Sequence, residues 1–463
     1  MNLVTTASPV RLEPSTPLVC CCGISFARGT AIYSTKSLSP QETIKIRNPP
    51  GARPRFSLVT AIVVAIWGAL ILIVSMSHLT TQRYAVAELG YFDDFTPYWN
   101  AAKEVAAGRT PYGWVENGIQ EQSDYGYTPF LALALAPITR LADFPTARWG
   151  WYLFGALCLG LGFVITAWTS RLSLHGRPAL ALVPCGIGLL PAAILNLAEG
   201  QVVPLVLLAF AGAYHGACGG GPLVSGLSIA TGAYLKSFPG FLAGYLFLRR
   251  RWTDLGATML FGAALVACSV ALLGWDPHWT YLTGVIPLQG SWFAAPFNVS
   301  ISGLLTRVLT ENAFTVPIFS IGATATNLLI ALVAGLILVL AAQAVWRATP
   351  RDEGPAFGLA VVTALLVSPI NGYYNLVICA IPLAVLAKRA QDDWPHHFRS
   401  LLVTALLLAM PIEISGLLPT EYPWWRDGLG TLLTSGPLLG LLALWVSLVL
   451  ICRRGAAPAR LNP

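Results

Sequence analysis

The chain has 463 residues, of which 55% are hydrophobic and only 11% are charged. Soluble globular proteins carry about 25% charged residues, so this composition excludes an ordinary soluble fold. The net charge of +7 does not indicate a nucleic-acid partner, because the basic residues stand in short clusters between apolar runs. Those runs recur from Ser57 to Cys452, and each is about 18 to 25 residues long, enough to cross a bilayer as a helix. Because a chain in lipid must satisfy its own backbone hydrogen bonds, we expect an all-α polytopic membrane protein.

Residues 1–50 differ from the rest, since they are rich in Ser, Thr and Pro and contain no long apolar run. Transit peptides share this composition. We favour a disordered tail or an over-extended start site, and we assign the segment no function. Residues 51–463 are expected to form a single transmembrane domain.

The first span is predicted at Ser57–His78, after two arginines that place the N-terminus in the cytoplasm. A polar segment, residues 79–126, follows it. The next spans are predicted at Tyr127–Leu141, Trp149–Thr169, Ala179–Leu197, Val202–Ala217, Leu223–Leu248 and Leu255–Leu273. A second polar segment covers residues 274–297, and the short apolar patch Val299–Leu309 after it is ambiguous. The last spans are predicted at Ile321–Val345, Pro355–Ile370, Tyr373–Ala387, Leu401–Gly416 and Leu429–Cys452.

The orientation of these spans follows from counting them. If they alternate and Val299–Leu309 does not cross, about twelve spans place nearly every strong basic cluster on the inner side. These clusters are Arg249–Arg251, Arg347–Arg351, Lys388–Arg399 and Arg453–Arg454. Arg171 and Arg177 are the exception and fall outside. Residues 79–126 and 274–297 both become outer loops.

The first outer loop contains a predicted amphipathic helix. Its apolar residues recur at helical spacing, at Phe95, Tyr98, Trp99, Ala102, Val105 and Ala106. Asp94 is a natural N-cap, and Gly108 suits the C-terminal stop. We expect the aromatic side to lie at the lipid headgroups, with the pair Asp93 and Asp94 just outside the membrane. Helix capping alone also explains Asp94, and the two roles can coexist.

Ionisable groups inside apolar runs indicate function, and Lys236 is the clearest example. Glu199 and Gln201 lie at a span end, where water can equally solvate them. Arg307 either neutralises a phosphate or extends its side chain to the headgroups. The nine cysteines and six histidines show no ligand pattern, and no P-loop, HExxH or GxSxG motif is present. We therefore expect no cofactor, and a divalent metal beside the aspartates has no further support.

The order of several short motifs resembles glycosyltransferase family 87, a group of polyprenyl-phosphate-sugar-dependent transferases of the GT-C superfamily. The first outer loop carries the resemblance in Asp94-Phe95-x-x-Tyr98-Trp99, then Pro111-Tyr112 and Tyr127-x-Pro129. It continues in Glu199-Gly200-Gln201, Lys236-x-x-Pro239, Asn298-x-Ser300 and Ser368-Pro369-Ile370. Family members commonly carry a Trp and a His just after this last turn. This chain has Asn371-Gly372-Tyr373-Tyr374-Asn375 there, without a histidine. Three interpretations stay open: Tyr374 takes the histidine position, the sugar or acceptor differs, or activity is lost.

The resemblance implies a GT-C bundle with its large outer loops after the first and seventh spans. It implies transfer of a hexose such as mannose, with inversion, from a polyprenyl-phosphate donor to a lipid or glycan acceptor outside the plasma (inner) membrane. Asp94 would be the catalytic base, with Asp93 in reserve. Substrate binding is expected from Tyr98, Trp99, Lys103, Tyr127, Gln201, Lys236, Asn298, Arg307 and Tyr374. A transporter or lipid flippase is the alternative, although no inverted repeat is evident; a non-catalytic scaffold is a third.

Overall fold

The computed structural model describes residues 94–115, 125–394, 396–410, 428–433 and 435–455. Within these ranges the chain folds into helices without a strand, and one isolated bridge pairs Asn298 with Gly372. The prediction of an all-α protein is confirmed. The predicted first span Ser57–His78, the N-terminal tail and Asp93 lie outside the described residues.

The longer helices carry most of the fold. They are α2 (Phe95–Ala106), α5 (Phe144–Thr169), α6 (Leu182–Ala198), α7 (Val203–His215), α8 (Pro222–Leu235), α10 (Trp252–Leu273), α14 (Ala323–Arg347), α15 (Glu353–Val367), α16 (Ala380–Asp392), α17 (His396–Leu408) and α19 (Gly436–Gly455). Short helices join them: α3 (Pro129–Leu135), α4 (Ile138–Leu141), α9 (Phe241–Leu248), α11 (Asp276–Thr280), α12 (Ile286–Leu288), α13 (Ile301–Leu309) and α18 (Gly428–Leu433). The 3-10 or π segments are η2 (Arg177–Ala181), η3 (Gly216–Gly220), η4 (Phe238–Gly240), η5 (Tyr281–Val285), η6 (Gln289–Trp292), η7 (Pro350–Asp352) and η8 (Tyr373–Cys379).

Seven of the described helical stretches are long and apolar enough to cross a membrane. They are Phe144–Thr169, Pro178–Ala198, Val203–Gly220, Trp252–Leu273, Ala323–Arg347, Tyr373–Asp392 and Gly436–Arg454. The polytopic membrane character is therefore confirmed, while the predicted total of twelve spans is not established. The patch Val299–Leu309 forms only α13, whose nine residues are too short to cross.

Several connections between helices meet at one end of the bundle, which we call the basic end. The Arg249 guanidinium donates to Glu353 at 2.6 Å, and that of Arg389 donates to Asp352 at 2.7 Å. Arg251 joins the same group through Glu353 at 3.3 Å and through Asp254 at 2.9 Å. Arg249 also donates to the Ala348 carbonyl at 2.6 Å, within the cluster Arg347–Arg351. These contacts bring together three of the basic clusters that the sequence assigns to one side.

The loop between α5 and α6 also lies at the basic end. The amide of Ser173 donates to Oε1 of Gln391 at 2.8 Å, and Nε2 of Gln391 donates to the Ser173 carbonyl at 2.9 Å. Because Gln391 lies near the end of α16 beside Arg389, this loop shares a side with the other basic clusters. The prediction that Arg171 and Arg177 face the opposite side is wrong.

Two errors in the predicted spans explain this difference. The run Tyr127–Leu141 is divided into α3 and α4 and does not cross, because Arg140 at its far end donates to the Ala106 carbonyl of α2 at 2.7 Å. The run Leu223–Leu248 is a helical hairpin, α8 and α9, which turns at Lys236. Both ends of the hairpin lie at the basic end, since Arg251 donates to the Ala217 carbonyl at 2.5 Å. Without a crossing at Tyr127–Leu141, the loops that follow it change sides relative to the prediction. Without a crossing at Leu223–Leu248 as well, the later loops return to the predicted side.

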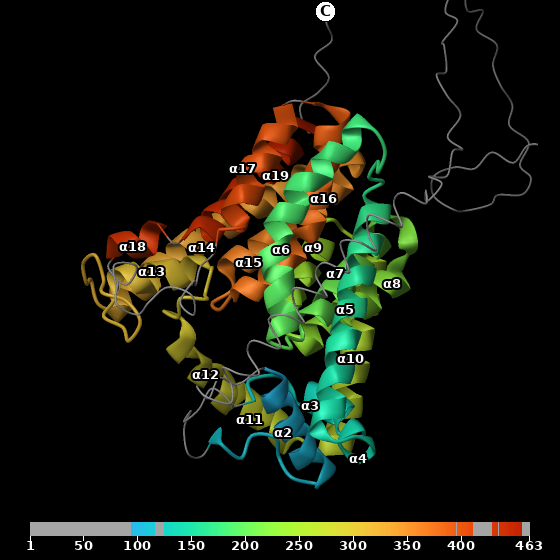
Figure 1. Cartoon of the computed structure of the whole chain (residues 1–463), viewed down its shortest axis with the longest axis vertical. Coiled ribbons are helices and arrows are strands. Elements are labelled where there is room, and N and C mark those ends of the chain that lie inside the picture. Colours follow the sequence, from blue (N-terminus) through green and yellow to red (C-terminus); the bar gives the residue numbers. More distant parts are fainter. Residues whose placement is uncertain (1–93, 116–124, 395, 411–427, 434, 456–463) are drawn as a thin grey trace, which may run out of the picture. The chain divides into compact units, whose positions relative to one another are not determined.

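The opposite end of the bundle, which we call the site end, carries both predicted outer loops. Figure 1 shows α2, α3 and α4 near α11 and α12 at its lower end. The ring of Tyr112 lies 6.1 Å from that of Tyr281, and Gln289 donates to the Gly126 carbonyl at 2.7 Å. The described parts of the two predicted outer loops therefore contact each other.

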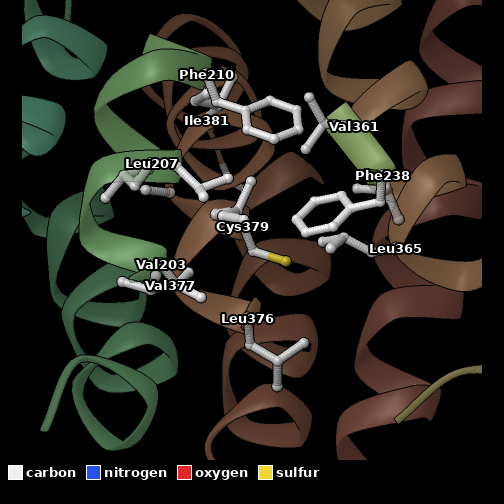
Figure 2. Packing of buried hydrophobic residues seen from close by; sticks show 14 of the residues in the cluster. Val203, Leu207, Phe210, Phe238, Val361, Leu365, Leu376, Val377, Cys379 and Ile381 are labelled. Atoms are coloured by element: carbon white, nitrogen blue, oxygen red, sulfur yellow. The ribbon is translucent and has the colours of Figure 1, made fainter. Parts of the chain in front are cut away.

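The core of the bundle lies between α7, α15 and the segment η8–α16 (Figure 2). Phe210 of α7 stacks on Phe238 with ring centres 5.8 Å apart, and Val361, Leu365 and Cys379 close around them. In a bilayer, close packing of this kind holds helices together more than removal from water does. The core fixes η8, and η8 carries Tyr374 and Asn375 to the site end.

Candidate functional site

Asp94 stands directly before α2, in the N-cap position that the sequence predicts. Its backbone amide donates to the Glu199 carbonyl at 2.8 Å, and its side chain makes no capping hydrogen bond to the first turn of α2. Capping is therefore not what this carboxylate does in the structure. The α2 helix itself confirms the predicted amphipathic element almost residue for residue.

The turn Glu199–Gln201 connects α6 with α7 and fixes the position of Asp94. Gly200 has φ +67°, a left-handed conformation that favours glycine. Its carbonyl accepts a 2.7 Å hydrogen bond from the Trp151 indole, and the Gln201 amide donates to the Asn196 carbonyl at 2.9 Å. The turn is thus anchored from both sides.

Lys236 lies at the break between α8 and η4, where its extended backbone ends the helix. Its ammonium donates to Oδ1 of Asn375 at 3.3 Å and lies over two aromatic rings, 4.5 Å from the centre of Tyr374 and 5.5 Å from that of Tyr127. The charges of Asp94 and Glu199 both act on this ammonium. One cation and two carboxylates therefore share a site between elements far apart in sequence.

Three tyrosines line the site around Asp94. The rings of Tyr98 and Tyr127 meet edge to face at 4.9 Å, and the Tyr127 hydroxyl donates to Oε1 of Gln201 at 3.4 Å. The Asp94 charge acts on the hydroxyls of Tyr98, Tyr127 and Tyr374. Burial, reinforced by Tyr127 and Asp94, raises the pKa of Tyr98 well above its usual value. Its hydroxyl therefore stays protonated.

Of the predicted site residues, the structure thus brings together Asp94, Tyr98, Tyr127, Gln201, Lys236 and Tyr374. Trp99 and Lys103 lie elsewhere on α2. Trp99 is buried against Phe144, with ring centres 5.9 Å apart, and Lys103 is exposed. The expectation that the aromatic side of α2 lies at the lipid headgroups is wrong, because Phe95, Tyr98 and Trp99 are buried within the protein.

Asn298 and Arg307 belong to a second polar cluster beside the site. Nδ2 of Asn298 donates to the Pro369 carbonyl at 2.9 Å, while its Oδ1 accepts from the Asn371 amide at 2.9 Å. The Arg307 guanidinium donates to the Ala295 and Asn298 carbonyls, each at 2.9 Å. Burial lowers the pKa of Arg307 to about 10, and only 5% of the residue is exposed. Both side chains hold backbone in place here.

Asn375 and Asn196 are site residues that the sequence reasoning missed. Asn375 contacts Lys236 and also donates to Oδ1 of Asn371 at 3.1 Å. Asn196 donates to the Tyr374 carbonyl at 2.6 Å. The signal was available, because both are amides close to the end of an apolar run, where polar side chains indicate a function. Glu199 was noticed in the sequence but not counted among the binding residues.

The site combines groups that suit proton removal and anion binding. The Asp94 carboxylate can accept a proton, and the Lys236 ammonium can neutralise an anion that forms beside it. Among the described residues no cluster of His, Cys, Asp and Glu could hold a metal ion. The described part of the site is thus built from carboxylates, amides, tyrosines and one lysine.

The comparison with family models decides what kind of protein this is. The model of glycosyltransferase family 87 matches residues 125–369, slightly more than half of the chain. The chain belongs to glycosyltransferase family 87. The suspected family is confirmed, and with it a transferase that takes a sugar from a donor to an acceptor in a membrane setting. None of the curated proteins matches the chain.

The family match places Tyr127, Glu199, Gln201 and Lys236 within the transferase region, as well as Asn298 and Arg307. Asp94 precedes the matched residues, and Tyr374 follows them. The hydrogen bond between Asp94 and Glu199 and the ring of Tyr374 over Lys236 connect these outlying residues to the matched region. The candidate site of this glycosyltransferase family 87 member therefore includes residues on both sides of the matched segment.

Proposed function

We propose that this glycosyltransferase moves a hexose, such as mannose, from a polyprenyl phosphate to a lipid or glycan acceptor at the outer face of the plasma membrane. The observation that carries the proposal is that the Asp94 carboxylate and the Lys236 ammonium share one site, where the charge of Asp94 acts on Lys236. A base and a cation in one site suit a reaction that removes a proton and releases a phosphate. The transporter or flippase that the sequence left open is not favoured, because the family is one of transferases.

In the proposed reaction, Asp94 accepts the proton of an acceptor hydroxyl as its oxygen attacks the anomeric carbon. The new carbon–oxygen bond forms while the bond from that carbon to the donor phosphate breaks. The electron pair of the broken bond leaves on the phosphate. Because attack and departure occur on opposite faces, the configuration of the carbon inverts.

Lys236 is the cation best placed for the departing phosphate. Its ammonium is fixed by Asn375 and by two aromatic rings, and it lies within the electrostatic reach of Asp94. Arg307 is less suited to this role than the sequence suggested, because its guanidinium already donates to two backbone carbonyls. A fixed charge that faces the leaving group lowers the barrier without reorganisation.

The side of the membrane is supported by the distribution of charge. Arg249, Arg251 and Arg389 gather at the basic end, and positive clusters prefer the cytoplasm. The site end then faces outside, where no nucleotide donor is present. A sugar used there must arrive already activated, and a polyprenyl phosphate provides both activation and a membrane anchor.

The test is transfer of radiolabelled sugar from polyprenyl-phosphate mannose, glucose or arabinose by purified protein in lipid. Asp94→Asn should lower turnover by about a hundred- to ten-thousandfold, the usual contribution of a general base. Glu104→Gln is the matched control, because Glu104 is a carboxylate on the same helix that is exposed and paired with Arg109. Turnover by Asp94→Asn equal to that of the control would refute the base role.

A further inference from the structure

Glu199 is the second carboxylate of the site, and the proposed reaction does not use it. Its carbonyl accepts from the Asp94 amide, so the two residues are joined through the backbone. Its charge acts on Lys236 and on Tyr374, the same groups that the charge of Asp94 reaches. The two residues are therefore neighbours in the site, and their charges act on the same groups.

We propose that Glu199, held in position by Gln201, binds ring hydroxyls of the transferred sugar. A carboxylate suits this ligand, because it accepts hydrogen bonds from hydroxyl groups. A carboxylate has about four acceptor sites, so Glu199 can receive hydroxyl protons beside its hydrogen bond from Gln201. The inference rests on the proposed function, since it names the part of the donor that this side of the site recognises.

The orientation of the two side chains is set before any substrate binds. Nε2 of Gln201 donates to Oε2 of Glu199 at 3.3 Å, and its Oε1 accepts from the Tyr127 hydroxyl at 3.4 Å. Gln201 is 2% exposed, so its amide is fixed from both sides. A chain of hydrogen bonds thus runs from Tyr127 through Gln201 to Glu199.

The backbone beneath these side chains is equally constrained. Gly200 lies against Phe95 and Tyr152, and a Cβ at this position would come within 3.2 Å of the first and 3.3 Å of the second. The Trp151 indole holds the Gly200 carbonyl. A preorganised turn keeps its groups at the right distance from a bound ring, as recognition of individual hydroxyls requires.

A direct test compares wild type with Glu199→Ala on a set of donors. The set contains the polyprenyl-phosphate hexose that the wild type uses and analogues in which each ring hydroxyl in turn is replaced by hydrogen. We expect Glu199→Ala to lower kcat/KM with the full donor by roughly ten- to a hundredfold, the effect of losing a hydrogen bond to a charged group. With the analogue that lacks the hydroxyl bound by Glu199, the kcat/KM of Glu199→Ala should be close to that of wild type.

Glu199→Asp should recover part of the lost activity, and Glu104→Gln should behave as wild type with every donor. A purely structural role for Glu199 would lower kcat/KM by the same factor for all donors, and that result would overturn the inference. Failure of the wild type to transfer any sugar would instead refute the proposed function. The two failures are therefore distinguishable.

Discussion

The ammonium of Lys236 lies 4.5 Å from the ring centre of Tyr374, so the face of an aromatic ring is one of its direct contacts. Tyr127 provides a second ring at 5.5 Å. Aromatic faces attract a cation, by about 2 kcal/mol or more where water is excluded, yet they leave its charge unneutralised. Lys236 is thus fixed in position by the two rings and Asn375, and the charges of Asp94 and Glu199 act on it.

The ring of Tyr374 should matter more than its hydroxyl. We expect Tyr374→Phe to keep the cation–π contact and to retain transfer close to wild type. Tyr374→Leu removes the ring and should lower kcat/KM for the donor by about tenfold or more, in line with the strength of the contact. Steady-state kinetics with a varied polyprenyl-phosphate donor measure both variants. Equal losses for Phe and Leu would assign the contribution to the hydroxyl instead.

Substitution by alanine should destabilise the protein more at Gly200 than at Gly108, a glycine with a similar backbone conformation. Gly108, at the end of α2, has φ +76°, and a Cβ added there would have nothing within 4 Å, whereas Gly200 at φ +67° faces Phe95. Each Ala substitution meets the left-handed penalty of about 1–2 kcal/mol. Gly200→Ala adds overpacking of about 1–3 kcal/mol.

Thermal unfolding and sugar transfer together check this prediction. Gly108→Ala should lower Tm slightly and leave transfer per folded molecule intact. Gly200→Ala should lower Tm further and reduce transfer, because the turn positions Asp94. Identical behaviour of the two variants would show that the turn is not tightly packed.

Glu353 should be a stability residue without a part in the reaction. It accepts from Arg249 at 2.6 Å, from Arg251 at 3.3 Å and from the Tyr245 hydroxyl, all at the basic end. Glu353→Gln leaves two arginines without their carboxylate. The free energy of unfolding should fall by an amount near the lower end of about 3–5 kcal/mol, because the group is partly exposed.

Asp392→Asn is the matched control, since the pair of Asp392 with Lys388 is more exposed and is worth at most about 1 kcal/mol. Chemical or thermal unfolding in detergent should show a clear loss for Glu353→Gln and almost none for Asp392→Asn. Transfer per folded molecule should be unchanged in both. A specific loss of transfer in Glu353→Gln would link the basic end to the reaction.

The loop between α5 and α6 should be shielded from the outside of the cell. His175 lies in that loop and is exposed, and Gly113 is exposed at the site end. In a chain whose native cysteines are replaced by alanine, His175→Cys should react with a membrane-impermeant maleimide only after cells are opened. Gly113→Cys should react in intact cells. Labelling of both in intact cells would contradict the placement of the two ends on opposite sides.

Sequence patterns were sufficient for the elements whose signal is local. Helical spacing of Phe95, Tyr98 and Trp99 predicted α2. The apolar patch Val299–Leu309 was ambiguous by itself, and the distribution of basic clusters favoured no crossing there, in agreement with the short α13. The runs Tyr127–Leu141 and Leu223–Leu248 were misassigned because hydropathy measures how apolar a run is. It does not reveal where the chain reverses.

The site itself was predicted only in part, for a related reason. Asp94 and Lys236 carry a local signal, a charge beside or within an apolar run. The meeting of Lys236 with Asn375 depends on how α8 and η8 pack, and no spacing along the chain encodes that contact. Arg307 also carries a local signal, but in the structure its guanidinium donates to two nearby backbone carbonyls.

The long separation between Lys236 and Asn375 also has a consequence for synthesis in the cell. The ribosome makes Lys236 139 residues before the amide that later holds it. The α8–α9 hairpin is therefore made before η8, which later contacts its lysine, and the candidate site is complete only when η8 and α16 have been inserted. Products that terminate earlier are expected to be inactive and to expose a charged hairpin to quality-control proteases.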